Sequence, residues 1–359
     1  MRQMQLDTDC EGPLALNDNA FEVCRDFITP EGDRFFTQVS RYDDFLADIG
    51  KPADYVAVTT LKLILPFLKA YGLTNALLRD YSLKTMKLVP GVEGAYKFLK
   101  AQDFPIFEIS TSYRQFAEAV GVRLGFDPGR IYSTELDLDR YTLSPGEAAA
   151  LKVLKDEIAG LPGIELPPEA ASLQDLPGPT QEAIHKLDRI FKEKVPALDI
   201  GVIYQEVNPV GGSEKARALS DSVAQTGVSL ADAIYVGDSI TDVQAFEAVR
   251  AGGGLSVSFN GNRYAVNAAE VMVVADNAWP IALIAAIFQL WGKEGVLEVA
   301  TGGAKSLVLP EKVIEPLSRG LEGRNFNLYH AGSPDLDAVA RESTAMRSRL
   351  RGEDVAALG

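Results

Sequence analysis

Cysteine and basic residues are scarce in this 359-residue sequence, and each scarcity excludes a class of protein. The two cysteines, Cys10 and Cys24, form neither a disulfide framework nor a metal cluster of recognisable spacing, so we expect a reducing, cytoplasmic environment. Lysine and arginine total 35 against 50 aspartates and glutamates, a formal net charge of −15. Because this charge repels polyanions, we expect neither nucleic acid nor an anionic membrane as a partner, although a local basic pocket could still bind a small anion.

Long hydrophobic runs are missing too. The longest uncharged apolar run, residues 278–292, is shorter than the ~20 residues of a membrane-spanning helix, and Gln289 interrupts it, so we expect a buried helix. The first ten residues lack the apolar core of a signal peptide. The spacings of a P-loop and of a dinucleotide-binding loop are absent around Lys215 and around residues 252–254, so neither kind of nucleotide site is expected.

Short apolar runs alternate with helical patterns along much of the chain. This alternation predicts an α/β fold with a parallel sheet. Ligands of such a sheet bind outside the carboxyl ends of its strands, so the residues that follow the apolar runs are the first candidates for function. The strand-like runs end at Leu6, Ile109, Val236 and Phe259, and the candidates that follow them are Asp7, Ser110 and Asp238.

Three stretches depart from the alternation. Residues 16–85 have apolar positions at helical spacing and predict a helical cap of domain size. Residues 143–199 contain closely spaced prolines before a helical pattern and are expected to form a second insertion. Residues 301–359 are expected to form a C-terminal appendage that packs on its own domain or on a dimer partner. The remainder is the predicted core: residues 1–15, 86–142 and 200–300.

Acidic residues stand at the ends of two predicted strands. Asp7 and Asp9 form a D-x-D pair after the first, and Asp238 and Asp242 lie in YVGDSITDVQAF after another. Gly237 permits a tight exit from that strand, which brings Asp238 to the same sheet edge as Asp7.

Polar groups suited to an anion accompany these acids. Ser110 and Thr111 end the run FPIFEI and stand before a predicted helix, whose first backbone N–H groups favour a negative charge. Lys215 lies near the start of another predicted helix.

These four elements, in this order, resemble the motifs of the haloacid dehalogenase-like (HAD) superfamily of phosphohydrolases. The stretch RLGFDPGRIYSTELDLD is similar to the phosphoserine-phosphatase branch, and YVGDSITDVQAFEAVRAGGGLSVSFNG is close to its fourth motif. The string DCEGPLALNDNAFEVC resembles a less-characterised branch, some members of which are labelled as subunits of an energy-converting hydrogenase. The sequence departs from the superfamily after Asp9, where Cys10, Glu11, Gly12 and Pro13 replace the usual Gly-Thr pair, and Glu11 receives no role.

The resemblance implies a Rossmann-like core, a helical cap after the first motif, and Mg²⁺-dependent hydrolysis of a small phosphate monoester. Asp7 would be the nucleophile that forms an aspartyl-phosphate, and the side chain of Asp9 the general acid–base. Mg²⁺ would be held by Asp7, by the backbone carbonyl of Asp9 and by Asp238.

The resemblance also implies which residues bind the phosphoryl group and which residue orients the groups around the metal. Lys215 and Ser110 would bind the phosphoryl oxygens, with Thr111 as the alternative to Ser110. Asp242 would orient either a metal-bound water or Lys215 from outside the ligand sphere.

Two other functions stay open at this point. The chain could be a non-catalytic accessory or sensor subunit that retains the metal and phosphate site, or a phosphomutase acting on a sugar phosphate. We expect a small phosphorylated metabolite as the ligand. Its identity and the oligomeric state, with a homo-oligomer as one alternative, are not fixed by any motif.

Overall fold

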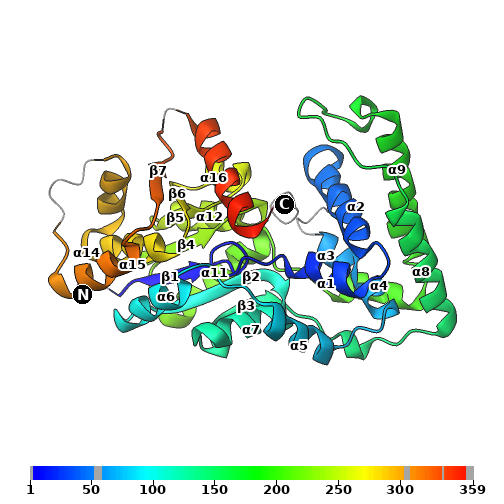
Figure 1. Cartoon of the computed structure of the whole chain (residues 1–359), viewed down its shortest axis with the longest axis horizontal. Coiled ribbons are helices and arrows are strands. Elements are labelled where there is room, and N and C mark those ends of the chain that lie inside the picture. Colours follow the sequence, from blue (N-terminus) through cyan, green and yellow to red (C-terminus); the bar gives the residue numbers. More distant parts are fainter. Residues whose placement is uncertain (1–2, 52–58, 303–307, 334, 353–359) are drawn as a thin grey trace.

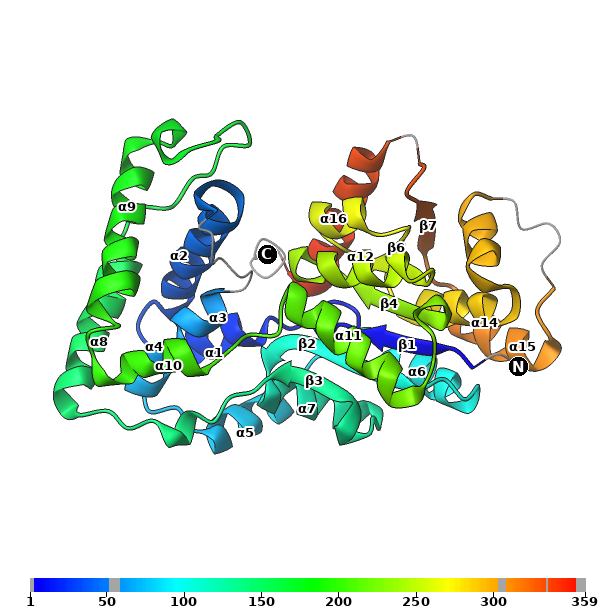
Figure 2. The same cartoon turned by 180° about the vertical axis from the view of Figure 1, so that it is seen from behind.

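A computed structural model describes residues 3–51, 59–302, 308–333 and 335–352. Parts of the predicted first strand, cap and C-terminal segment lie outside the described residues, at positions 1–2, 52–58, 303–307, 334 and 353–359. The chain forms a β-sheet with helices on both faces and, beside it, a separate group of helices (Figure 1). Figure 2 shows the same two parts from behind.

The sheet has seven strands in the order β3-β2-β1-β4-β5-β6-β7. All neighbouring strands are parallel except β7, which pairs antiparallel with β6. The first six strands have the order of a Rossmann fold, whose topological switch point lies between β1 and β4. The predicted fold class, an α/β Rossmann-like core with a parallel sheet, is confirmed. The strands are β1 Gln5–Thr8, β2 Ile106–Tyr113, β3 Ile131–Thr134, β4 Ala233–Gly237, β5 Leu255–Phe259, β6 Val271–Ala275 and β7 Phe326–His330.

Helices cover both faces of the sheet, which explains why the central strands are buried on both sides. One face packs against α6 (Val92–Ala101), α7 (Arg114–Leu124), α14 (Trp279–Ala300) and α15 (Glu311–Leu321). The other packs against α11 (Ser213–Thr226), α12 (Val243–Ala251) and α13 (Arg263–Ala268).

Helix α14 contains the longest apolar run of the sequence. Its length and composition would allow it to cross a membrane, but 56% of its most apolar window is buried inside the protein. The helix packs against α6 and the sheet, and Gly292 (φ +69°) kinks it. We therefore describe α14 as a core helix.

The two predicted insertions form one helical unit, which we call the cap. The residues 16–85 and 143–199 share a single apolar cluster. Polar contacts also join them: the Gln38 side chain donates to the carbonyl of Leu161 at 2.8 Å, and the Tyr42 hydroxyl to Asp188 at 2.6 Å. The cap helices within these ranges are α1 Asn19–Phe27, α2 Gly32–Phe45, α3 Thr59–Leu63, α4 Leu65–Ala70, α5 Asn75–Thr85, α8 Pro145–Ala159 and α9 Gly178–Arg189. Helix α10 (Ile203–Glu206), predicted as part of the core, joins the same apolar cluster, as do Leu136 and Val207, so the second insertion extends over about 136–208.

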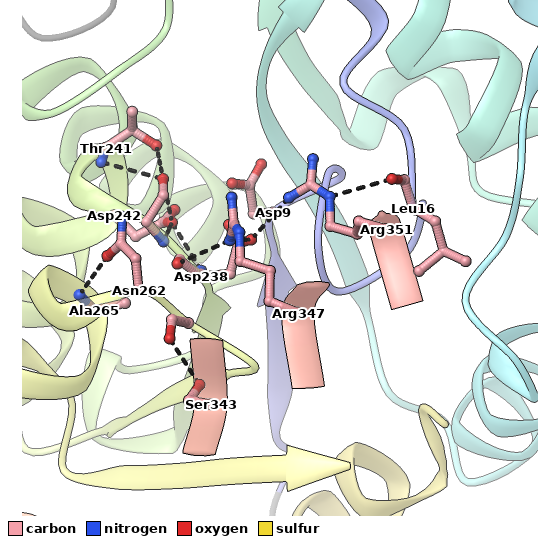
Figure 3. Close-up of polar contacts among 12 residues, drawn as sticks. Asp9, Leu16, Asp238, Thr241, Asp242, Asn262, Ala265, Ser343, Arg347 and Arg351 are labelled. Carbon is pink, nitrogen blue, oxygen red and sulfur yellow. Dashed lines mark hydrogen bonds and ion pairs between the residues drawn. The ribbon is translucent and has the colours of Figure 1, made fainter. Parts of the chain in front are cut away.

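The segment 301–359, predicted as an appendage, is part of the core wherever the structure describes it. It contributes β7, which extends the sheet beside β6. The last helix, α16 (Leu336–Arg351), packs against α13 and β6. Its C-terminal end lies at the carboxyl edge of the sheet, beside the polar cluster drawn in Figure 3.

Candidate active site

Two aspartates meet at the switch point between β1 and β4. Thr8 pairs with Val236 in the parallel ladder, and the next N–H along β1, that of Asp9, donates to the Val236 carbonyl at 2.8 Å. Asp238 follows β4 directly. The carboxylate oxygens of Asp9, Asp238 and Asp242 lie within 4.8 Å of one another, and all three residues are buried (Figure 3). The sequence predicted that Asp238 would lie at the same sheet edge as Asp7, and the structure places it beside Asp9.

Lys215 supplies the counter-charge at the centre of this cluster. Its ammonium lies 2.6 Å from Asp9 Oδ2 and 2.7 Å from Asp242 Oδ1, and the side chain is fully buried. Burial by itself lowers the pKa of Lys215, but Asp242 and Asp9 together raise it above its usual value. The lysine is therefore a permanent cation that fixes two of the three carboxylates.

The Asp242 carboxylate is held in place by several hydrogen bonds. Its carboxylate accepts from the Tyr235 hydroxyl at 2.8 Å and from the backbone N–H groups of Asp238 at 3.0 Å and Ser239 at 2.9 Å. Since its oxygens are already used by these donors and by Lys215, Asp242 orients these neighbouring groups.

Asp7, the predicted nucleophile, does not join the cluster. It is fully buried within β1 and accepts from the Ser222 hydroxyl at 2.5 Å and from Gln5 Nε2 at 2.9 Å. Burial raises the pKa of Asp7 to about 7, and the hydrogen bonds from Ser222 and Gln5 act in the opposite direction. Asp7 is not one of the described residues that line the cavity at the sheet edge. The site therefore begins at Asp9, two residues later than predicted.

Glu11 stands two residues after Asp9, just as Asp9 stands two residues after the predicted nucleophile Asp7. It lines the same cavity and accepts from the backbone N–H of Asn19 at 2.7 Å. Burial, followed by the charge of Asp18, raises the pKa of Glu11 to about 8, while Arg351 lowers it. The pair Asp9 and Glu11 thus has the spacing of the predicted D-x-D pair, displaced by two residues. The apolar run in the sequence ends at Leu6, but the strand itself continues through Asp7 to Thr8, so the end of the strand was predicted too early.

Gly12 lets the loop after Glu11 pass close to Asp238. Its φ of +104° lies in the left-handed region, which other residues rarely adopt. A Cβ atom at this position would stand 2.2 Å from Asp238 Oδ2. The departure from the usual Gly-Thr pair therefore keeps a glycine where the Asp238 carboxylate needs space.

The hydroxyls at the end of β2 are arranged differently from the prediction. The Ser110 hydroxyl is buried and accepts from the backbone N–H of Ser112 at 3.1 Å, so it shapes the strand end. Thr111 and Ser112 line the cavity, and their hydroxyls have no hydrogen-bond partner within the described part of the chain. Of the two predicted candidates, Thr111 thus faces the site and Ser110 does not. Ser112 was missed because strand β2 was predicted to end at Ile109, whereas it continues to Tyr113.

Two arginines of α16 reach the site from the C-terminal segment. Arg347 forms an ion pair with Asp238 Oδ2, and Arg351 approaches the same oxygen at 3.3 Å (Figure 3). Arg351 also donates to the carbonyls of Leu16 at 3.1 Å and Asn17 at 2.6 Å, where the chain leaves the core for the cap. The four-residue spacing of these arginines is the signal that the sequence offers for them, but the segment was predicted only as an appendage.

Asp9 and Asp238 of this cluster line a cavity of about 170 Å³ between the core and the cap, whereas Lys215 and Asp242 are fully buried and are not among its described lining residues. The cap contributes Asn19, Phe36, Asp43 and Leu61 to its lining, among other residues. The two parts touch beside it, where the Tyr264 hydroxyl of α13 donates to Asp48 of the cap at 2.6 Å. The cavity is therefore a partly open site, lined by charged residues of the core and by both polar and apolar residues of the cap.

The acids at this edge suit a hard divalent cation. Asp9 and Asp238 offer carboxylate oxygens, the ligand type that Mg²⁺ prefers, and Asp242 stands next to them. The predicted ligand set changes in one respect, because Asp7 faces Ser222 and not this group. The backbone carbonyl of Asp9, predicted as a ligand, accepts a hydrogen bond from the Thr8 hydroxyl at 2.9 Å.

Comparisons with known proteins give one strong similarity. No family model and no curated protein matches the chain. The structure of gene product AF1437 from Archaeoglobus fulgidus shares 31% sequence identity over 99% of both chains, with a TM-score of 0.80.

Weaker similarities extend to two further solved structures. A HAD family hydrolase from Salmonella enterica serovar Typhi has 13% identity and a TM-score of 0.42 over 70% of this chain and 60% of that one. A phosphoserine phosphatase, solved as a phospho-aspartyl intermediate analogue, has 14% identity and a TM-score of 0.46 over 76% and 93%. The label of a hydrogenase subunit gains no support from these similarities.

Proposed function

Since the chain belongs to the same family as gene product AF1437 from Archaeoglobus fulgidus, we propose its function from its own site: it is a HAD-like, Mg²⁺-dependent phosphatase of small phosphate monoesters. The observation that carries this proposal is the buried group of Asp9, Asp238, Asp242 and Lys215 at the switch point of the sheet. A second carboxyl group, that of Glu11, stands two residues after Asp9 at the wall of the same cavity.

Asp9 is the nucleophile in this proposal. Its Oδ1 accepts from the N–H of Cys10 at 2.7 Å and its Oδ2 from Lys215, so the carboxylate is fixed and faces the cavity. Burial raises the pKa of Asp9 to about 7, and Lys215 opposes that rise and favours the charged form. The carboxylate oxygen attacks phosphorus as the bond to the leaving oxygen breaks, and water then hydrolyses the aspartyl-phosphate.

Glu11 is the general acid and base. With a pKa of about 8, its carboxyl group is protonated at neutral pH and can donate that proton to the leaving oxygen. The resulting carboxylate then takes a proton from the attacking water, which restores the starting state. In this proposal the Asp9 carboxylate is therefore the nucleophile and the protonated Glu11 carboxyl group is the acid.

The metal and the donors balance the charge of the phosphoryl group. When bound, Mg²⁺ would be held by Asp9 and Asp238 and would supply positive charge beside the reacting oxygens. The hydroxyls of Thr111 and Ser112, two residues that line the cavity, would bind the phosphoryl oxygens, and Lys215 would supply positive charge beside them from its place against Asp9. Asp242 keeps Lys215 in place.

The cap limits the size of the substrate and the access of water. A cavity of about 170 Å³ holds on the order of ten waters, so the ligand has a similar number of non-hydrogen atoms. Because the cap covers part of the site, it would limit the access of free water during phosphoryl transfer. A small phosphorylated metabolite fits this size. A cytoplasmic location stays our expectation, in keeping with the buried free thiols of Cys10 and Cys24.

The presence of both a nucleophile and an acid favours turnover over a sensor role. Purified full-length protein should release p-nitrophenol from p-nitrophenyl phosphate with Mg²⁺ and stop when EDTA is added, and a panel of small phosphate esters should contain better substrates. The Asp9→Asn variant serves as the blank. Absence of hydrolysis across the panel, or equal rates for the variant and the wild type, would overturn the proposal. A transfer product in place of inorganic phosphate would identify a phosphomutase.

A further inference from the structure

We propose that the C-terminal helix α16 completes the active site, and that Arg347, held beside Arg351, binds the phosphoryl oxygens of the ligand. The inference rests on the proposed function, since it assigns the anion to the same cavity. It adds a binding residue from a segment outside the four motifs that suggested the function.

One face of α16 is built to bring its arginines to the cavity. Four residues at four-residue spacing lie on this face: Val339, Ser343, Arg347 and Arg351. Val339 packs against the core side chains Val266 and Met272, and the Ser343 hydroxyl donates to the carbonyl of Gly261 at 2.7 Å. Residues spaced by four share one face of a helix, so these anchors direct the arginines toward Asp238 (Figure 3).

Arg347 has a donor that the protein does not use. The residue is only 5% exposed, and its guanidinium pairs with Asp238 through Nη1. Its Nε–H has no hydrogen-bond partner among the residues that the structure describes. A buried charged donor without an acceptor is costly, which points to an acceptor supplied by a ligand in the cavity that Arg347 lines.

Three more unused polar groups line the same cavity. They are the Asn19 side-chain amide of the cap and the hydroxyls of Thr111 and Ser112 at the end of β2, all without partners inside the described ranges. All three can donate a hydrogen bond. Residues from the cap, from β2 and from α16 that carry unused donors thus line one cavity, and a ligand rich in acceptor oxygens could satisfy several of them together. A phosphoryl group is such a ligand.

A phosphoryl dianion in this cavity lies near the carboxylates of Asp9, Asp18 and Asp238, which repel it. Besides the Mg²⁺ of the proposed function, the four motifs contribute one cation, Lys215, and α16 adds Arg347 to the lining of the cavity. The planar guanidinium of Arg347 can present two N–H groups to two phosphoryl oxygens, which an ammonium cannot do in the same fixed geometry. Arg351 is tied to Leu16 and Asn17 and therefore holds its charge next to Arg347 without needing to move.

A purely structural role makes a different prediction. If Arg347 serves only as the counter-charge of Asp238, its removal leaves phosphate affinity unchanged and strengthens Mg²⁺ binding, because a competing cation leaves the carboxylate. If Arg347 binds the anion, its removal weakens phosphate binding. The two roles are therefore separated by measuring both ligands.

The test compares Arg347→Met with Arg349→Met, because Arg349 lies on the exposed side of the same helix. Binding of inorganic phosphate to the full-length protein is measured by isothermal titration calorimetry, with Mg²⁺ and again with EDTA. We expect Arg347→Met to weaken phosphate binding at least about tenfold and Arg349→Met to leave it unchanged. Arg347→Lys keeps the charge and loses the planar guanidinium, so its phosphate affinity should fall between those of the two methionine variants. If Arg347→Met unfolds at a much lower temperature than the wild type, Arg347→Lys is used in its place.

The result that overturns the inference is a phosphate affinity of Arg347→Met equal to that of the wild type, with Mg²⁺ binding unchanged or strengthened. An equal loss in Arg349→Met would overturn it too, because the effect would then be one of overall charge. A wild-type protein that binds phosphate through Arg347 and hydrolyses no ester would refute the proposed function and leave this inference standing.

Discussion

Asp7 and Asp9 are separated by one residue and yet have opposite surroundings. Asp7 is enclosed by Ser222 and Gln5 between the sheet and α11, whereas Asp9 stands beyond the strand end at the wall of the cavity. Both have a pKa raised to about 7 by burial, so the pKa alone does not tell them apart. Geometry does, because only Asp9 contacts Lys215 and can reach a ligand.

The first prediction at this scale compares the two aspartates. Asp9→Asn should lower kcat for p-nitrophenyl phosphate by at least about 10³-fold, because the nucleophile is lost. Asp7→Asn should keep kcat within about tenfold of the wild type, since the change is nearly isosteric and lies outside the cavity. Steady-state kinetics of the two variants with Mg²⁺ checks this, and an inactive Asp7→Asn protein with wild-type stability would contradict it.

The second prediction follows from the pKa of about 8 at Glu11. The group donates a proton to the leaving oxygen, so it works below this pH and loses its proton above it. With an alkyl phosphate, kcat/KM should therefore fall as the pH rises through about 8. The fall should vanish in Glu11→Gln, which is slow at every pH.

An internal control is available for this pH profile. p-Nitrophenyl phosphate has a leaving group that departs without a proton, so its kcat/KM should depend less on Glu11. A profile that rises above pH 8, or that is identical in Glu11→Gln, would exclude Glu11 as the acid.

At the scale of elements, the loop after β1 and the helix α16 approach Asp238 from two sides. Gly12 makes the first approach possible, as its missing side chain leaves room for the Asp238 carboxylate. Arg347 makes the second. The position of Asp238 thus depends on a turn near the start of the chain and on a helix near its end.

Substitution of Gly12 tests this close approach. Gly12→Ala should abolish most activity and weaken Mg²⁺ binding, because the added Cβ would collide with Asp238 and the backbone would be strained by about 1–3 kcal/mol. Gly72→Ala is the matched control: its φ is also positive at +81°, and nothing lies within 4 Å of the added carbon. Gly72→Ala should lose some thermal stability and no activity; equal losses of activity in both variants would contradict the account.

The sequence predicted the elements better than their ends. The sheet, Lys215, Asp238 and Asp242 followed from apolar runs and motif spacing. The sequence placed the start of the site at Asp7, whereas the structure places it at Asp9. Strand β1 continues through Asp7 as a buried strand with polar residues, and an apolar run cannot mark the end of such a strand. The role of α16 depends on an ion pair between residues 109 positions apart, which no local pattern encodes.

For the whole molecule, the main consequence is that the cap is one unit made from two insertions. Each insertion leaves and re-enters the core at neighbouring points: Ala15 bridges to Leu88, and the N–H of Val210 donates to the Thr134 hydroxyl at 3.0 Å. Between these points the two insertions share one apolar cluster. Removing only one of them would expose the apolar surface of the other.

This predicts the outcome of deletions. Replacing residues 16–85 alone by a short Gly/Ser linker should give an aggregating protein, whereas replacing 16–85 and 136–208 together should give a soluble core. The double deletion should bind Mg²⁺ and hydrolyse p-nitrophenyl phosphate slowly, with discrimination among metabolites lost. Size-exclusion chromatography and substrate panels check this; a soluble single deletion that keeps the substrate ranking of the full chain would contradict it.

The central claim is that Asp9 carries the phosphoryl group during turnover, and trapping that group tests it most directly. Glu11→Gln, which lacks the base for the second step, is mixed with substrate and Mg²⁺, quenched in acid and reduced with borohydride, which converts an aspartyl-phosphate into homoserine. Tandem mass spectrometry of the N-terminal peptide then locates the change. If Asp9 is the nucleophile, homoserine is found at position 9; homoserine at position 7, or none in any peptide while product is released, would show that Asp9 does not carry the phosphoryl group.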